Sequence, residues 1–241
     1  MPATPLQHFE QDIARSRALI VHADRLPRQT VAEQLLRSDI LRSAWMFAVG
    51  SLDAYFSDAY TDVVAATIIS KSRHASMVLP EFFYDIKFPV RAVLEPYAVN
   101  MNWRWRMAAR RMMAHENVLK LNTIQGLFNK FFRDGRRFFN DLLHDWLMHS
   151  DAKKRLFGVS RPVYNLSSPP DQRNARRLAM EQLGERFKAI FQRRHDCIHN
   201  CDRPRVSPQP LILGGTVLKV VQDVESLVRR SDEQINSEFR E

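Results

Sequence analysis

Glycine is scarce in this chain, with 7 residues among 241. A fold made of short strands and many tight turns needs more of the residue that adopts left-handed backbone conformations freely. Leucine, alanine and arginine, which favour helices, are plentiful instead. The composition therefore predicts an all-α fold rather than a turn-rich β-fold.

Cysteine is rarer still, with only Cys197 and Cys201. Two neighbouring thiols do not make a disulfide framework, which indicates a reducing compartment. The N-terminus has no basic segment followed by an apolar run, so we expect no signal peptide. Charged residues interrupt every apolar stretch well before the roughly 18 residues that a membrane span needs. We therefore expect a soluble, cytoplasmic protein without a membrane partner.

Acidic residues are outnumbered, because 27 Asp and Glu stand against 36 Lys and Arg, and the formal net charge is +9. Such an excess favours nucleic acid or another polyanion as partner, although it also serves solubility and says nothing about fold. Hydrophobic residues make up 45% of the chain, which is enough for a sizeable core. The length fits one large domain or two small ones.

Helical periodicity covers most of the chain. The segments expected to be helical are 5–24, 31–69, 107–132 with a break near 116–117, 136–157, 170–199, and a last helix from Gly214 that frays from Gln234. Thr30 is predicted to cap the second helix, with Glu33 completing a capping box. Prolines and turn residues indicate short helices at 70–103, a loop at 158–169 and no regular helix at 204–210.

Aromatic and cationic residues alternate in the segment Trp103–Arg106, and Arg110 and Arg111 follow. Such interleaving can stack nucleic-acid bases and hold phosphates. The alternative is that the tryptophans belong to the core while the arginines form a solvated face. We favour this second interpretation.

An arginine followed five residues later by a histidine occurs three times, at Arg17–His22, Arg110–His115 and Arg194–His199. Chance alone supplies roughly one such pair in a chain of this composition, so the spacing by itself is not specific. The third pair has a polar residue after both members, and it alone ends a long predicted helix. These features select Arg194–His199 as the candidate site.

The segment Arg194-His195-Asp196-Cys197-Ile198-His199-Asn200, followed by Asp202-Arg203-Pro204, resembles the motif of the HEPN superfamily of helical RNA-cutting and nucleotide-binding domains. The likeness is to the RiboL-PSP-type branch, whose early helix is similar to Ala48–Phe56 with its acidic Asp53 and aromatic Tyr55. The resemblance implies an antiparallel HEPN-like helical bundle over residues 1–241, with an additional helical insertion at about 70–170.

The resemblance also implies a metal-independent endoribonuclease that needs no cofactor. Internal cleavage of RNA needs a base for the 2′-hydroxyl proton and a cation at the phosphate, and histidine and arginine suit these tasks. His199 is then the acid/base catalyst and Arg194 the group that stabilises the phosphate, leaving a 2′,3′-cyclic phosphate. Further residues expected to bind or orient the substrate are His195, Asn200, Asp196, Arg193 and Arg203.

Residues five apart on an α-helix point about 140° away from each other. Arg194 and His199 therefore cannot face one point from the middle of a straight helix. Either the helix ends near Ile198, or two chains share the site across a two-fold axis. HEPN ribonucleases use the second arrangement, so the resemblance implies a homodimer with a composite active site.

Other interpretations stay open for the same residues. His195, Cys197, His199 and Cys201 alternate as zinc ligands on a strand can, but a helix would scatter them, so no metal is expected. A non-catalytic HEPN-like module for nucleic-acid binding or dimerisation is the main functional alternative, and a DNA-binding regulator is a weaker one. Many relatives in the superfamily are toxins or phage-defence effectors, which implies an antitoxin or regulatory partner.

Overall fold

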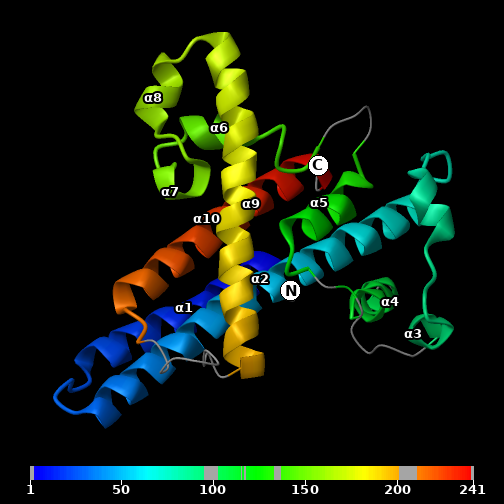
Figure 1. Ribbon diagram of the computed structural model, residues 1–241. Coiled ribbons are helices and arrows are strands. Elements are labelled where there is room, and N and C mark those ends of the chain that lie inside the picture. The colour runs from blue at the N-terminus through cyan, green and yellow to red at the C-terminus, as the bar shows by residue number, and fades with distance from the viewer. Residues whose placement is uncertain are drawn as a thin grey trace.

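The chain folds into helices, without a strand, over the residues that the computed structural model describes: 3–94, 103–114, 116, 118–132, 137–200 and 211–239. This confirms the predicted all-α fold class. Figure 1 shows two long neighbouring helices crossed by a third, with shorter helices packed around them. Within the described residues, no helix is both long and apolar enough to cross a membrane.

Helices α1 (Pro5–Arg25) and α2 (Val31–Arg73) form an antiparallel hairpin. The predicted capping box is confirmed, because Thr30 accepts a hydrogen bond from the backbone N–H of Glu33 and the Glu33 carboxylate accepts one from the N–H of Thr30. That backbone hydrogen bond lowers the pKa of Glu33. Helix α2 continues past its predicted end to Arg73.

Helices α9 (Pro169–Asn200) and α10 (Gly214–Phe239) complete the long-helix framework. Helix α10 packs along α1 and α2, and α9 crosses α2 (Figure 1). The limits predicted for α9 are confirmed within one residue at each end. The fraying predicted from Gln234 is wrong, because Gln234 and Ile235 are buried and the helix extends to Phe239, which packs on Phe131.

Short helices lie between α2 and α9 in the chain and pack around this framework. They are η1 (Glu81–Asp85), α3 (Val90–Leu94), α4 (Trp103–Met113), α5 (Leu121–Asn129), α6 (Leu143–Met148), α7 (Lys154–Phe157) and α8 (Arg161–Leu166). The predicted helix 107–132 is thus two helices, α4 and α5, separated near the predicted break.

Two predictions in this region are wrong. A continuous helix over 136–157 does not form, because Phe138 and Phe139 are both buried and Phe139 adopts a positive φ of 70° that a right-handed helix excludes. The predicted loop at 158–169 contains α8, in which Pro162 lies in the first turn, where its missing N–H costs nothing.

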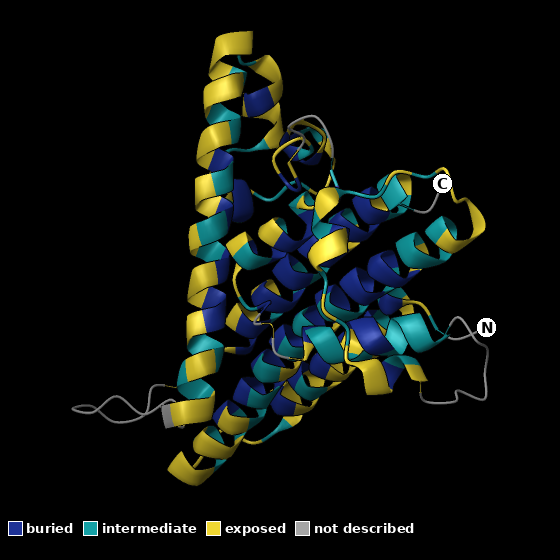
Figure 2. Cartoon of the chain, turned by 90° about the vertical axis from the view of Figure 1, so that its right-hand side faces the viewer, coloured by how far each residue is buried: buried dark blue, intermediate teal, exposed yellow. Residues whose placement is uncertain are grey.

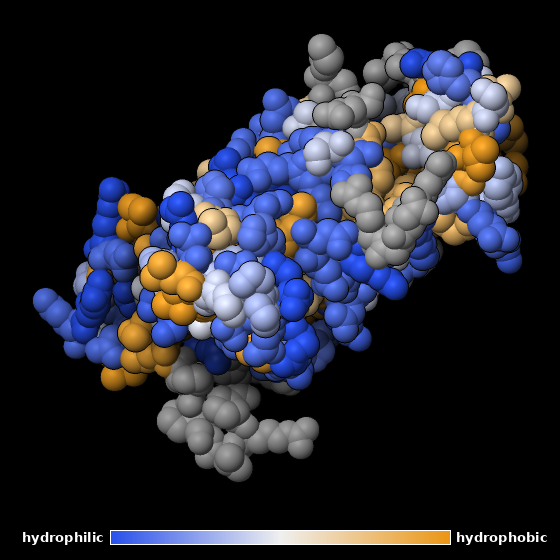
Figure 3. All heavy atoms as spheres, turned by 90° about the horizontal axis from the view of Figure 1, so that it is seen from above, coloured by the Kyte–Doolittle hydropathy of each residue, from blue (hydrophilic) through white to orange (hydrophobic). Residues whose placement is uncertain are grey.

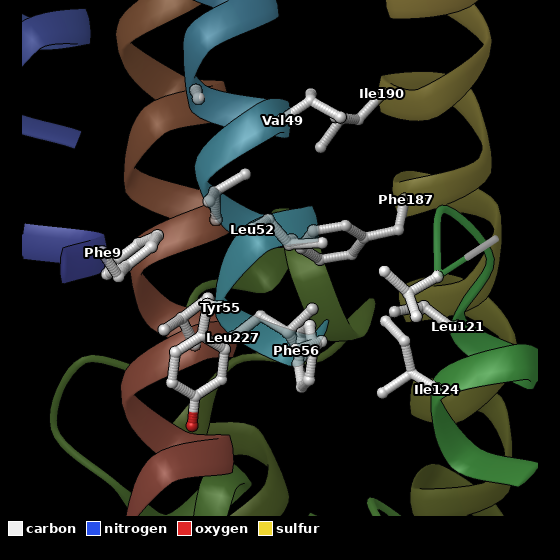
Figure 4. Packing of buried hydrophobic residues seen from close by; sticks show 14 of the residues in the cluster. Phe9, Val49, Leu52, Tyr55, Phe56, Leu121, Ile124, Phe187, Ile190 and Leu227 are labelled. Carbon is white, nitrogen blue, oxygen red and sulfur yellow. The ribbon is translucent and has the colours of Figure 1, made fainter. Parts of the chain in front are cut away.

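One part of the core lies where α2, α5 and α9 meet. Leu52 and Phe56 of α2 lie opposite Phe187 of α9, and Leu121 and Ile124 of α5 close the space between them (Figure 4). Figure 2 shows that each long helix turns its buried face inward and its exposed face to solvent. Hydrophilic residues dominate the face seen in Figure 3, where apolar side chains form separate patches.

A buried carboxylate joins three of the helices. Asp223 of α10 is fully buried and accepts hydrogen bonds from Arg155 of α7 at 2.7 Å and from Arg186 of α9 at 2.9 Å. The two guanidiniums are only partly exposed, and both pair with this one carboxylate. A buried charge is tolerated when it is paired and hydrogen-bonded in this way.

We predict that Asp223→Ala lowers the free energy of unfolding by at least about 2–3 kcal/mol. Removing one partner of a fully buried pair costs about 3–5 kcal/mol, and the remaining arginines here can partly reach water. Urea unfolding followed by circular dichroism measures the loss. The control is Glu181→Ala, which breaks the exposed Arg177–Glu181 pair of α9 and should cost less than about 0.5 kcal/mol. Equal losses in the two variants would contradict the prediction.

Candidate functional site

Arg194 extends the buried apolar stripe of α9. Leu183, Phe187 and Ile190 recur at helical spacing and are buried, and Arg194 follows Ile190 by one turn on the same side. Its side chain is half-buried. The helix face that packs on α2 thus ends in a guanidinium.

Trp45 of α2 holds this part of α9 in place. Its indole N–H donates a hydrogen bond to the carbonyl oxygen of Ile190 at 3.1 Å. In an α-helix that carbonyl is also the acceptor for the N–H of Arg194. Val49 of α2 packs against Ile190 beside this bond (Figure 4). The backbone that carries Arg194 is therefore fixed by both a polar and an apolar contact.

Asp53 of α2 is electrostatically coupled to Arg194. Burial raises the pKa of Asp53, and the positive charge of Arg194 offsets part of that rise. The sequence singled out Asp53 only as part of the run that resembles an early HEPN helix. Its proximity to Arg194 depends on how α2 and α9 cross, which local periodicity does not encode.

His195 and His199 form an exposed pair on another face of α9. Their ring centroids lie 4.3 Å apart with the ring planes inclined by 43°. Residues four apart share a helix face, which explains the contact. His195 therefore supports the ring of His199 from one turn away, on the exposed surface at the end of the helix.

Helix α9 continues through His199 to Asn200. The alternative in which the helix ends near Ile198 and His199 swings round is therefore wrong. Arg194 and His199 stay about 140° apart on one helix. A single chain directs Arg194 towards α2 and leaves His199 facing solvent.

Two cavities flank Arg194, which lines both of them. The first has a volume of about 590 Å³ and lies between the start of α5 and α9, where Lys120, Lys188 and His195 line it. The second, of about 430 Å³, lies between α1, α2 and α9. Arg15 and Phe47 line this second cavity, with the guanidinium 4.5 Å from the centre of the phenyl ring.

The remaining predicted residues are only partly accounted for. Arg193 is half-buried, and Asp196 accepts a hydrogen bond of 2.9 Å from the side chain of Gln192. The side chain of Asn200 and all of Arg203 lie outside the described residues. The substrate-binding or orienting roles of these four residues stay predictions.

The other arginine–histidine pairs differ from the candidate. Arg17 forms a two-bond ion pair with Glu225 of α10, which gives it a structural role. His22 is exposed on α1. Arg110 is exposed on α4, and His115 lies outside the described residues. Arg194, by contrast, lines two cavities and lies beside the half-buried carboxylate of Asp53.

The helical course of α9 bears on the zinc alternative. Cys197 and His195 point about 160° away from each other on the helix, so these two side chains cannot hold one ion together. Among the described residues, no group of three or more histidines, cysteines and carboxylates could hold a metal. Cys201, the fourth residue of the alternating set, lies outside them.

The Trp103–Arg106 segment is neither a buried aromatic core nor a solvated cationic face. All four side chains are half-buried at the start of α4. The guanidiniums of Arg104 and Arg106 lie 4.9 Å from the ring centres of Trp105 and Trp103. Arg106 also pairs with Asp62 of α2. The interpretation favoured from the sequence is corrected, because both arginines lie against tryptophan rings of α4 and Arg106 also joins α4 to α2.

No protein-family model matches this chain, and no match is found among the curated proteins or the solved structures. The geometry around Arg194 and His199 therefore has to support any functional conclusion.

We predict a pH-dependent effect of Asp53→Asn on stability. Because the folded-state pKa of Asp53 is raised above its ordinary 3.8, the folded protein keeps a proton there that the unfolded chain has released. The contribution of Asp53 to stability therefore falls as the pH rises from the ordinary pKa to the raised one. Asparagine does not titrate, so D53N lacks this loss of stability.

Urea unfolding of wild type and D53N at about pH 4 and at pH 7 tests this prediction. The wild type should gain stability relative to D53N at the lower pH. Arg194→Ala should enlarge the dependence, because it removes the charge that offsets the effect of burial. A difference between wild type and D53N that is the same at both pH values would contradict the raised pKa of Asp53.

Proposed function

We propose that this protein is a metal-independent endoribonuclease of the HEPN type, which cleaves RNA through attack of the 2′-hydroxyl on the adjacent phosphate. The proposal rests on the environment of Arg194. It ends the buried stripe of α9, is coupled to Asp53 and lies between two cavities, five residues before an exposed histidine. This pattern agrees with the motif that the segment resembles.

The proposed chemistry divides the reaction between two side chains. His199 takes the proton from the 2′-hydroxyl and later returns a proton to the departing 5′-oxygen. Arg194 stabilises the extra negative charge on the phosphate, and its guanidinium remains charged throughout. The products are a 2′,3′-cyclic phosphate and a 5′-hydroxyl. His195 would orient the ring of His199, which it contacts in the free protein.

The direction of the two side chains supports a homodimer. Arg194 and His199 diverge by about 140° on one continuous helix, so Arg194 of one chain would meet His199 of a second across a two-fold axis. We propose a composite site of this kind. The biological role that agrees with the resemblance is a cytoplasmic toxin or phage-defence effector, held in check by an antitoxin or regulatory partner.

A non-catalytic HEPN-like nucleic-acid-binding or dimerisation module is the second candidate. The observation that favours it is the same divergence, because the single chain does not bring Arg194 and His199 to one point. Cationic side chains on the first cavity would still bind a polyanion in such a module.

We predict that the purified protein cleaves total cellular RNA or tRNA in the presence of EDTA and leaves cyclic phosphate ends. His199→Ala should lower the rate by about 10²–10⁴, the usual contribution of a general acid–base group. Arg194→Ala should lower it by about 10²–10³, as for the loss of one charge-stabilising donor.

His22→Ala is the matched control. His22 is the exposed histidine of the Arg17–His22 pair on α1, which has the same five-residue separation, so its substitution should not affect the rate. Equal cleavage by wild type, R194A and H199A would exclude this motif as the active site. Folding of each variant is checked by circular dichroism, so that loss of structure is not mistaken for loss of catalysis.

We predict complementation between the two inactive variants. Mixed dimers of R194A and H199A contain one site with an intact arginine from one chain and an intact histidine from the other. Mixing the variants after mild dissociation should therefore restore activity that neither has alone, at a mass near twice 28.2 kDa by light scattering. Dimers that form but recover no activity would place both residues of each site in the same chain.

A further inference from the structure

We infer that the first cavity, between the start of α5 and α9, binds the single-stranded stretch of RNA next to the cleaved phosphate. This inference rests on the proposed ribonuclease function and specifies where its substrate lies. We call this cavity the α5–α9 groove. The side chains on which the inference depends are those of Lys120, Asn122, Lys188, Gln192, Arg194 and His195.

The charge of the α5–α9 groove suits a phosphate backbone. Lys120 and Lys188 are exposed on opposite walls, one at the start of α5 and the other on α9. Glu185 is the acidic residue among those that line it, and it lies 3.4 Å from Lys188 in a highly exposed pair. Such a surface pair holds its partners weakly, so Lys188 can turn to a phosphate.

The groove lies on the face of α9 that carries the proposed catalytic histidine. Lys188 and His195 are seven residues apart, and His199 is four residues further, so the three share one face within about 40°. Lys188 and His195 are about 10 Å apart along the helix axis. A strand held at Lys188 and followed along this face therefore reaches the exposed pair of histidines.

The walls of the α5–α9 groove suit nucleotides of one strand. Its volume of about 590 Å³ is within the range of pockets that enclose small organic ligands. Leu119, Leu121 and Phe191 give it apolar surface for ribose and base faces, and Asn122 and Gln192 carry amides that can bond to base edges. Proteins that read RNA commonly splay out unpaired bases in this way, whereas a duplex presents its backbone and grooves instead.

The test measures binding without cleavage. All proteins carry His199→Ala, and the probe is a fluorescent single-stranded RNA oligonucleotide of mixed sequence. Its Kd is measured at several salt concentrations, with and without Lys120→Gln and Lys188→Gln. Each phosphate of a single strand that a lysine no longer neutralises lowers the slope of log Kd against log salt by about 0.7, so the slope of the double variant should fall by about 1.4.

Lys154→Gln is the matched control. Lys154 is exposed on α7, and Figure 1 shows α7 and α5 on opposite sides of α9. The control should keep the slope of the H199A parent. A slope in the double variant equal to that of the control would overturn the inference, whether or not the wild type cleaves RNA.

The ligand class is tested separately by competition. Unlabelled single-stranded RNA should displace the probe from the parent protein, and the same sequence as a duplex should compete at least tenfold less well. Equal competition by the duplex would overturn the single-strand assignment. If the wild type fails to cleave RNA but the double variant shows the expected fall in slope, the ribonuclease proposal fails while the groove remains an RNA-binding site.

Discussion

The packing of α9 on α2 is the contact on which the rest of the structure depends. It buries the apolar stripe of α9 that ends at Ile190, and it includes the hydrogen bond from Trp45. It also brings Arg194 within electrostatic range of Asp53. The same crossing leaves room for α5 to close the core from the other side, which creates the α5–α9 groove. Local stability and the geometry of the candidate site therefore have the same origin.

This crossing also explains why one chain cannot complete the proposed active site. The stripe that buries Phe187 and Ile190 points Arg194 inward, and helix geometry then turns His199 about 140° away to solvent. Ending the helix early would have changed that direction, but α9 continues to Asn200. In the proposed composite site, a second copy supplies the missing partner.

The excess of positive charge has two separate uses. Arg155 and Arg186 are bound to the buried Asp223 and tie α7 and α9 to α10, and Arg106 joins α4 to α2. These cations serve the fold. Lys120 and Lys188 instead lie on an exposed groove beside Arg194. Net charge alone could not separate the two groups, because burial and pairing decide which cations remain accessible to a ligand.

The sequence by itself determined the all-α class, the capping box of α2, the extent of α9 and the placing of Arg194 and His199 near its end. These features depend on periodicity and on residues a few positions apart, which a single chain segment encodes. Only the tertiary structure decided the break at Phe138 and Phe139, the full length of α10, the approach of Asp53 to Arg194 and the groove between α5 and α9. Each of these depends on contacts between segments distant in sequence, where burial against a neighbouring helix outweighs local helical preference.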